Sequence, residues 1–88
     1  MPAPTLAQRE RILKRYGETY FACPTNLDYP LDSKARISSA RAYYPRKGTV
    51  KCTGGRKRIC RRAKKVGFLK PDYSGYRGWK QFCARALM

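Results

Sequence analysis

The segment GGRKRICRRAKK, residues 54–65, gathers positive charge of a kind that binds phosphate groups. Its basic residues, with no acid among them, are Arg56, Lys57, Arg58, Arg61, Arg62, Lys64 and Lys65. The planar guanidinium of arginine matches phosphate geometry, and each neutralised phosphate releases condensed counterions, which favours binding. Because Arg46, Lys47 and Lys51 add to this charge just upstream, we expect all of these residues to contact a nucleic-acid backbone without reading its base sequence.

The whole positive excess of the chain lies in its C-terminal part. Of 88 residues, 21 are Lys or Arg and 5 are Asp or Glu, which gives a formal net charge of +16. Residues 1–32 hold equal numbers of basic and acidic side chains, so the excess belongs to residues 33–88, where Asp72 is the single acid. A surface that serves solubility alone intersperses both signs. The asymmetry therefore favours a polyanionic partner over a merely solvated face.

Two further functions fit the same charge. In the first, the chain is a minor capsid or other structural component of a viral assembly, and its basic face meets acidic protein or the genome. In the second, it is a cationic, membrane-active protein held by disulfides. Tight and salt-dependent binding of nucleic acid favours genome binding or condensation, whereas lysis of anionic vesicles favours membrane activity.

Aromatic residues are interleaved with the basic ones and could stack on unpaired bases. Tyr44, Trp79 and Phe82 fall at positions that pack a core, and we expect them to be buried there. Tyr73 and Tyr76 lie in the Gly-, Ser- and Pro-containing segment KPDYSGYRG, residues 70–78. We therefore take Tyr73 and Tyr76 as the candidates for base stacking.

The four cysteines, Cys23, Cys52, Cys60 and Cys83, allow three interpretations. A structural zinc site usually contains a close cysteine pair or histidines, and this chain has neither, so zinc ranks third and no cofactor is expected. Disulfides and buried thiols rank equally, because Cys60 and Cys83 fall on apolar helix faces. Without histidine, and with five scattered acids, a cysteine nucleophile would have only lysine as its base. We expect a protein that is not an enzyme.

The pattern of apolar residues and helix caps predicts a mainly α fold: one small domain, residues 1–88, built as a bundle of about four short helices with irregular connecting loops. The first helix follows Thr5 and ends before Gly17, and the second begins at Asp32 or Ser33 and ends at Pro45. The third is the basic segment, ended by Gly67 with Phe68 folding back, and the fourth is WKQFCARALM. The expected buried faces consist of Leu6, Ile12, Leu13 and Tyr16; Ile37, Ala40 and Tyr44; Ile59, Cys60, Ala63 and Val66; and Trp79, Phe82, Cys83, Ala86 and Leu87.

Three connectors complete this expected fold. Residues 20–30, with two prolines, predict an irregular connector, and residues 46–55 a loop or a short strand pair. No stretch reaches the ~20 apolar residues of a membrane span, and the N-terminal residues, charged from Arg9 onwards, lack the apolar region of a signal peptide. We expect an intracellular or virion protein, with the nucleus as an alternative in a eukaryotic host because basic clusters serve as import signals.

The sequence YPLDSKARISSARAYYPRKG, followed by KCTGGRKRICRRAKKVGF, resembles small basic helical modules of uncharacterised viral and phage proteins. The resemblance covers residues 29–68. The residues that carry its first motif are Pro30, Leu31, Asp32, Ser33, Arg36, Ala40 and Tyr43. The resemblance implies a virus-encoded, virion-associated protein and brings no biochemical activity with it. The cysteines depart from the pattern of those modules.

Overall fold

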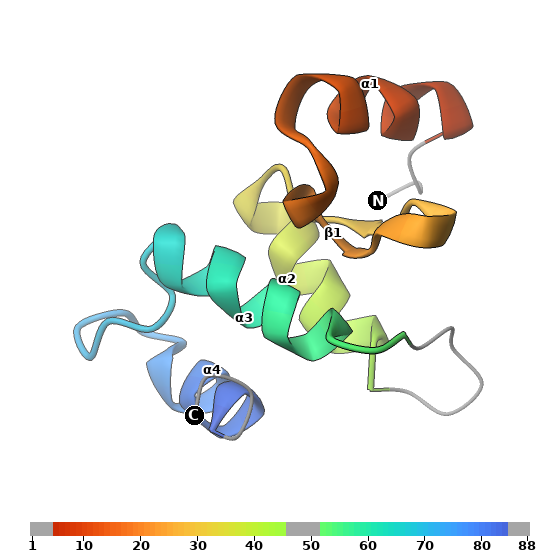
Figure 1. The fold of residues 1–88 in the computed structure, drawn as a ribbon. Coiled ribbons are helices and arrows are strands. Elements are labelled where there is room, and N and C mark those ends of the chain that lie inside the picture. Colours follow the sequence, from red (N-terminus) through yellow and green to blue (C-terminus); the bar gives the residue numbers. More distant parts are fainter. Residues whose placement is uncertain (1–4, 46–51, 85–88) are drawn as a thin grey trace.

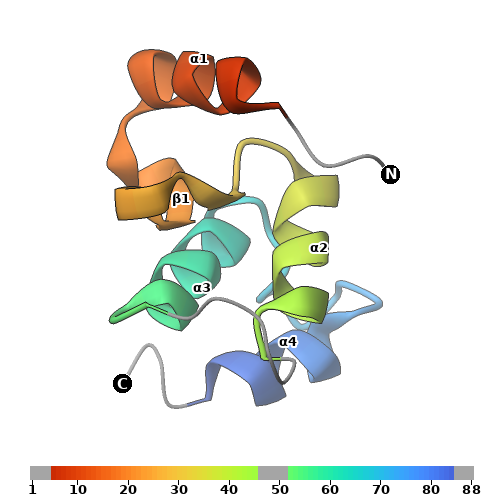
Figure 2. The ribbon, with the colours of Figure 1, turned by 90° about the vertical axis from the view of Figure 1, so that its right-hand side faces the viewer.

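A computed structural model describes residues 5–45 and 52–84. Along the chain it contains α1 (Leu6–Tyr16), the 3-10 helix η1 (Glu18–Tyr20), β1 (Phe21–Cys23), the 3-10 helix η2 (Pro24–Asn26), β2 (Asp28–Pro30), α2 (Lys34–Tyr43), α3 (Gly55–Lys65) and α4 (Tyr76–Cys83). The described part is mainly helical, as the sequence predicts. Helix α1 lies at one end, α4 lies at the other, and α2 and α3 lie between them (Figures 1 and 2).

Local chemistry sets the helix ends. Thr5 and Gln8 form a capping box, in which the Gln8 N–H donates to Thr5 Oγ1 at 3.2 Å and the Thr5 N–H donates to Gln8 Oε1 at 2.9 Å. The Arg36 N–H donates to Ser33 Oγ at 3.2 Å, which caps α2. Helix α3 ends in a Schellman motif at Gly67, where the Phe68 N–H donates to the carbonyl of Ala63 at 2.9 Å. The predicted caps of these three helices are confirmed.

The segment expected to be an irregular connector instead contains a small antiparallel sheet. Strands β1 and β2 pair with Phe21 opposite Pro30 and Cys23 opposite Asp28, and every residue of β1 is buried. A three-residue strand that is buried throughout has no alternation of apolar and polar residues, so the usual sequence pattern of a strand is missing. Of residues 46–55, positions 46–51 lie outside the described residues, as do the expected core residues Ala86 and Leu87.

Helix α3 lies at the centre of the core. Its side chains Ile59, Cys60 and Ala63 are fully buried, and α3 packs against β1, α2 and α4. Helix α2 presents Ile37 and Ala40 to this core, in agreement with the sequence pattern. The other members of the cluster are Ala22, Cys23, Leu31, Tyr44, Phe68, Trp79 and Cys83, with Tyr29, Cys52, Val66, Leu69 and Phe82 packed against it. The basic residues of α3 are thereby left on its outer side.

The four cysteines form two disulfides. Cys23–Cys52 ties β1 to the segment that enters α3, and Cys60–Cys83 ties α3 to α4. Disulfide formation is thus confirmed, and the alternative of buried free thiols is wrong. Disulfide sulfurs are not thiolate ligands, and the described residues contain no other cluster of His, Cys, Asp or Glu that suits a metal. In a domain this small, each cross-link contributes about 3–4 kcal/mol of stability.

Helix α1 and the start of α4 depart from the predicted pattern. In α1 only Ile12 is buried, whereas Leu6 is 63% exposed and Tyr16 is 41% exposed, so the expected apolar face is wrong at these two positions. Helix α4 begins at Tyr76, inside the segment expected to be a turn-rich link.

Every helix of the described residues is too short or too polar to span a bilayer.

Candidate functional site

The outermost face of α3 carries four exposed cations. Lys57, Arg61, Lys64 and Lys65 follow helical spacing and lie opposite the buried face of the same helix. We call these four residues the α3 stripe. In the part of the chain that the structure describes, no carboxylate pairs with any basic residue of α3; the ion pairs there join Arg9 to Asp28 and Arg36 to Asp32. The α3 stripe therefore presents unneutralised charge to solvent.

Two other arginines of α3 face the β1–β2 hairpin and bind its backbone. Arg58 donates from Nε to the carbonyl of Ala22 at 2.8 Å, and from Nη2 to the carbonyl of Thr53 at 2.9 Å. Arg62 donates from Nε to the carbonyl of Leu31 at 3.1 Å. Both side chains are partly buried. These hydrogen bonds hold α3 against the hairpin. Because a guanidinium has five N–H donors, each arginine keeps further donors for an anion.

A groove of about 670 Å³ lies between η1 and α3. Its lining consists of Thr19, Tyr20, Arg58, Arg61, Arg62, Lys64 and Lys65. We call it the η1–α3 groove. It brings together five of the seven basic residues of α3, and its lining residues, as far as the structure describes them, include no acid. Its aromatic wall is the ring of Tyr20, and the guanidinium carbon of Arg62 lies 3.9 Å from the centre of that ring. The lining is therefore cationic, and it suits the phosphate groups of a ligand.

The remaining predicted residues lie elsewhere. Arg56 is exposed on the α4 side of α3, with its guanidinium carbon 4.5 Å from the centre of the Phe82 ring. Tyr73 stacks on Phe68 at 4.9 Å between centroids, and Tyr76 is half-buried. Arg46, Lys47 and Lys51 lie outside the described residues. Neither Tyr73 nor Tyr76 lines the η1–α3 groove; the aromatic residue there is Tyr20, which falls in the segment expected to be an irregular connector.

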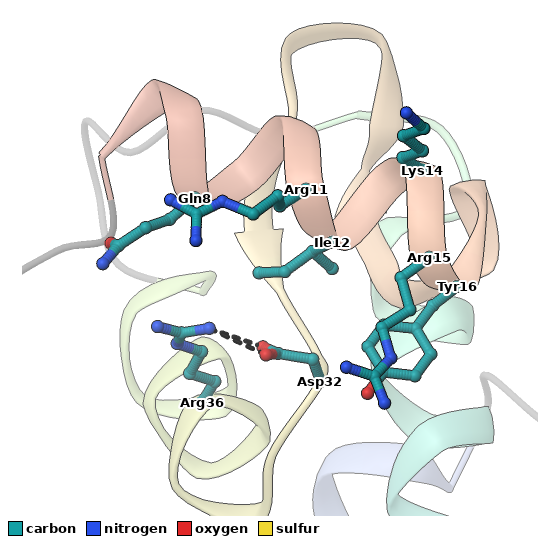
Figure 3. A pocket seen from close by; sticks show the side chains of 8 residues that line it. All are labelled: Gln8, Arg11, Ile12, Lys14, Arg15, Tyr16, Asp32 and Arg36. Carbon is teal, nitrogen blue, oxygen red and sulfur yellow. Dashed lines mark hydrogen bonds and ion pairs between the residues drawn. The ribbon is translucent and has the colours of Figure 1, made fainter.

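A second pocket, of about 440 Å³, lies between α1 and α2 (Figure 3). Its lining consists of Gln8, Arg11, Ile12, Lys14, Arg15, Tyr16, Asp32 and Arg36. We call it the α1–α2 pocket. Arg36 Nη1 binds both carboxylate oxygens of Asp32 at 2.8 Å. Residues 1–32 have no net charge, so their sequence does not indicate an anion site. In the folded chain, however, Asp32 pairs with Arg36 and does not neutralise the arginines of α1.

No protein-family model matches the chain, and searches of curated proteins and of solved structures found no significant match. The η1–α3 groove, the α3 stripe and the α1–α2 pocket are the features whose chemistry and geometry indicate a function.

Proposed function

We propose that this chain binds nucleic acid through phosphate contacts, without base-sequence specificity and without catalysis. The observation that carries the proposal is the η1–α3 groove, where five cations converge and none of the described residues of the wall is acidic. Phosphates placed along the groove and the α3 stripe would release their counterions on binding, so the affinity should fall steeply as salt rises.

The charge of α3 has a cost in the free protein, which supports a role in binding. Lys57 and Arg61, and Arg61 and Lys65, are like-charge pairs four residues apart on an exposed helix face. Each such pair destabilises a helix by about 0.2–0.5 kcal/mol. No acid on α3 offsets the repulsion. A bound polyanion would remove it, and solubility alone would not require it.

Arg58 and Arg62 make the groove rigid at its base. Their Nε atoms bind backbone carbonyls of the hairpin region, so the remaining donors are held in place before any ligand arrives. Pre-ordered side chains lose less conformational entropy on binding than free ones. The lysines of the α3 stripe are exposed and suit contacts with phosphates at variable positions along a backbone.

The two disulfides favour, as a second candidate, a cationic protein that acts on anionic membranes. Its basic helix would have to place an apolar face in the lipid. In α3, however, Ile59, Cys60 and Ala63 are fully buried, and Cys60 is cross-linked to Cys83. Leakage of dye from anionic vesicles would favour this candidate. A structural role in a viral assembly depends on the sequence resemblance and on the same positive charge.

The disulfides also bear on where the nucleic acid is met. Disulfides persist in oxidising surroundings, including the periplasm, the outside of the cell and the virion. A virion-associated protein that coats or condenses a genome combines such surroundings with a polyanionic partner. We therefore propose the virion as the place of action in preference to a reducing cytosol.

The proposal is tested with a fluorescent oligonucleotide and a charge variant of the α3 stripe. The variant is Lys57→Gln/Arg61→Gln/Lys64→Gln/Lys65→Gln. A matched control removes four exposed cations outside both pockets: Lys34→Gln/Lys70→Gln/Arg77→Gln/Lys80→Gln. The α3 variant should lose about tenfold or more in affinity relative to the control, and its slope of log affinity against log salt should be lower by about 3. Equal losses in the two variants would show that net charge alone matters, and would contradict the proposal.

A further inference from the structure

We infer that the α1–α2 pocket is a second phosphate site for the same ligand, and that this ligand is a single-stranded nucleic acid running from the η1–α3 groove past Tyr20 and Tyr16. The inference rests on the proposed function and extends it to a site that the sequence does not indicate. It assigns a role to α1, which contributes one buried residue, Ile12, to the described structure.

The pockets meet at a pair of stacked tyrosines. Tyr16 lines the α1–α2 pocket, and Tyr20 lines the η1–α3 groove. Their ring centres are 4.5 Å apart and their planes differ by 12°. The two pockets are therefore adjacent, and a ligand that leaves one along this stack enters the other.

An arginine lies beside each ring. The guanidinium carbon of Arg15 is 5.3 Å from the centre of the Tyr16 ring, and that of Arg62 is 3.9 Å from the centre of the Tyr20 ring. Aromatic rings next to cations are typical of proteins that bind single strands, because bases stack on the rings while the cations follow the phosphates. The Tyr20 ring is covered by Arg62 and stacked against Tyr16, so Tyr16, which is 41% exposed, is the residue that a base would contact. Bases inside a duplex are already stacked on one another, so this feature favours a single strand.

Within the α1–α2 pocket, the charge balance favours an anion. Asp32 is neutralised by Arg36, which holds both of its carboxylate oxygens. In the described structure no carboxylate contacts Arg11 or Arg15, and both line the pocket. Gln8 Oε1 accepts the Thr5 N–H, which leaves the amide nitrogen of Gln8 to donate. In Figure 3, Arg11 and Gln8 lie over Arg36, Arg15 lies on the far side of Asp32, and Lys14 points away. A phosphate would thus meet the arginines of α1 as its main partners.

The length of the ligand separates the two sites. Helix α3 has 11 residues and is about 16 Å long. At ~3.4 Å per phosphate along a stacked strand, α3 is covered by about five nucleotides. The longest dimension of the molecule is 36 Å. A strand that covers the whole of α3 must therefore exceed about five nucleotides before it also occupies the α1–α2 pocket.

The experiment measures affinity for oligothymidylates of about 4 to 16 nucleotides. It compares the unaltered protein, Arg11→Gln/Arg15→Gln, and the control Lys34→Gln/Lys70→Gln, which removes equal charge from exposed residues outside both pockets. On the shortest strands, Arg11→Gln/Arg15→Gln should bind like the control. On the longest it should lack the gain in affinity that the unaltered protein and the control show, and its salt slope should be lower by about 1.4, or 0.7 for each lost contact.

Three outcomes would overturn the inference. A gain with strand length that is the same in Arg11→Gln/Arg15→Gln and in the control would show that the α1–α2 pocket binds no phosphate of this ligand. An equal dependence on Arg11 and Arg15 with duplexes of the same length would remove the single-strand assignment. If the α3 stripe variant and its own control bind strands of every length with equal affinity, the proposed function itself is contradicted, and with it the inference. The α3 variant and the α1 variant therefore report on the two ideas separately.

Discussion

Arg62 of α3 donates from Nε to the backbone carbonyl of Leu31, 3.1 Å away, just after β2 ends. Leu31 is fully buried, and its carbonyl would otherwise need another donor. The same guanidinium lies over the Tyr20 ring. One side chain thus joins α3 to the hairpin and to the Tyr20 ring of the groove. A substitution that keeps the positive charge of Arg62 but removes these contacts should therefore change stability without changing the number of cations.

We predict that Arg62→Lys lowers the free energy of unfolding by about 1.5 kcal/mol, because lysine keeps the charge but loses the planar Nε contact and the stacking on Tyr20. Arg61→Lys is the matched control, since Arg61 is exposed and makes no hydrogen bond or ion pair within the described residues. Urea unfolding measures both variants. The salt slope of nucleic-acid binding should stay the same in both, because the number of cations does not change. Equal stability of the two variants would contradict the anchoring role of Arg62.

Gly55 gives a second prediction, in which the sign of the effect is informative. A Cβ atom at position 55 would lie 2.6 Å from Tyr44 Oη and 2.8 Å from the ring of Tyr44. The hydroxyl of Tyr44 donates to the carbonyl of Cys52 at 2.9 Å, so the ring cannot move without losing that bond. Replacing a helical glycine by alanine ordinarily stabilises a protein by about 0.5–1 kcal/mol. Gly55→Ala should instead destabilise it by about 1–3 kcal/mol in urea unfolding. An increase in stability would show that Tyr44 does not fix the start of α3.

The two disulfides should differ in their access to a reducing agent. Cys60 and Cys83 are both buried, whereas Cys52 is partly exposed at the entrance to α3. Under a limiting thiol reductant, Cys23–Cys52 should therefore open before Cys60–Cys83, because a thiolate must reach a sulfur to attack it. Alkylation and peptide mass spectrometry after brief reduction identify the first pair. Earlier labelling of Cys60 and Cys83 would contradict this order.

The features that the sequence predicts are those decided within a few residues. The N-cap at Thr5, the serine cap of α2 and the Schellman end at Gly67 each need partners only three to five positions away. The basic face of α3 follows from spacing, because burial of Ile59 turns the cations outward. These interactions do not depend on residues that are distant in the sequence, so the sequence alone predicts them.

The features that the sequence misses depend on distant partners. Arg58 and Arg62 bind carbonyls 36 and 31 residues away, so nothing near them shows that they anchor the hairpin as well as carry charge. Tyr20 becomes part of a site only because η1 packs against α3. Strand β1 is three residues long and wholly buried, which leaves no pattern to detect. The α1–α2 pocket likewise combines side chains of α1 with Asp32 and Arg36, which are distant from α1 in the sequence.

The repulsion along α3 gives the last prediction. Arg61 lies four residues from both Lys57 and Lys65 on the exposed face. Arg61→Glu replaces two repulsive pairs by two attractive ones, each worth about 0.2–0.5 kcal/mol, and an acid placed four residues before Lys65 has the more favourable orientation. The free protein should therefore melt a few degrees higher at low salt, and the difference should shrink at about 1 M salt because the charges are then screened. Nucleic-acid binding should weaken more than in Arg61→Gln, since a carboxylate repels phosphate. A residue kept for stability would show the opposite, so a lower melting temperature of Arg61→Glu at low salt would contradict the view that α3 holds its charge for a polyanionic partner.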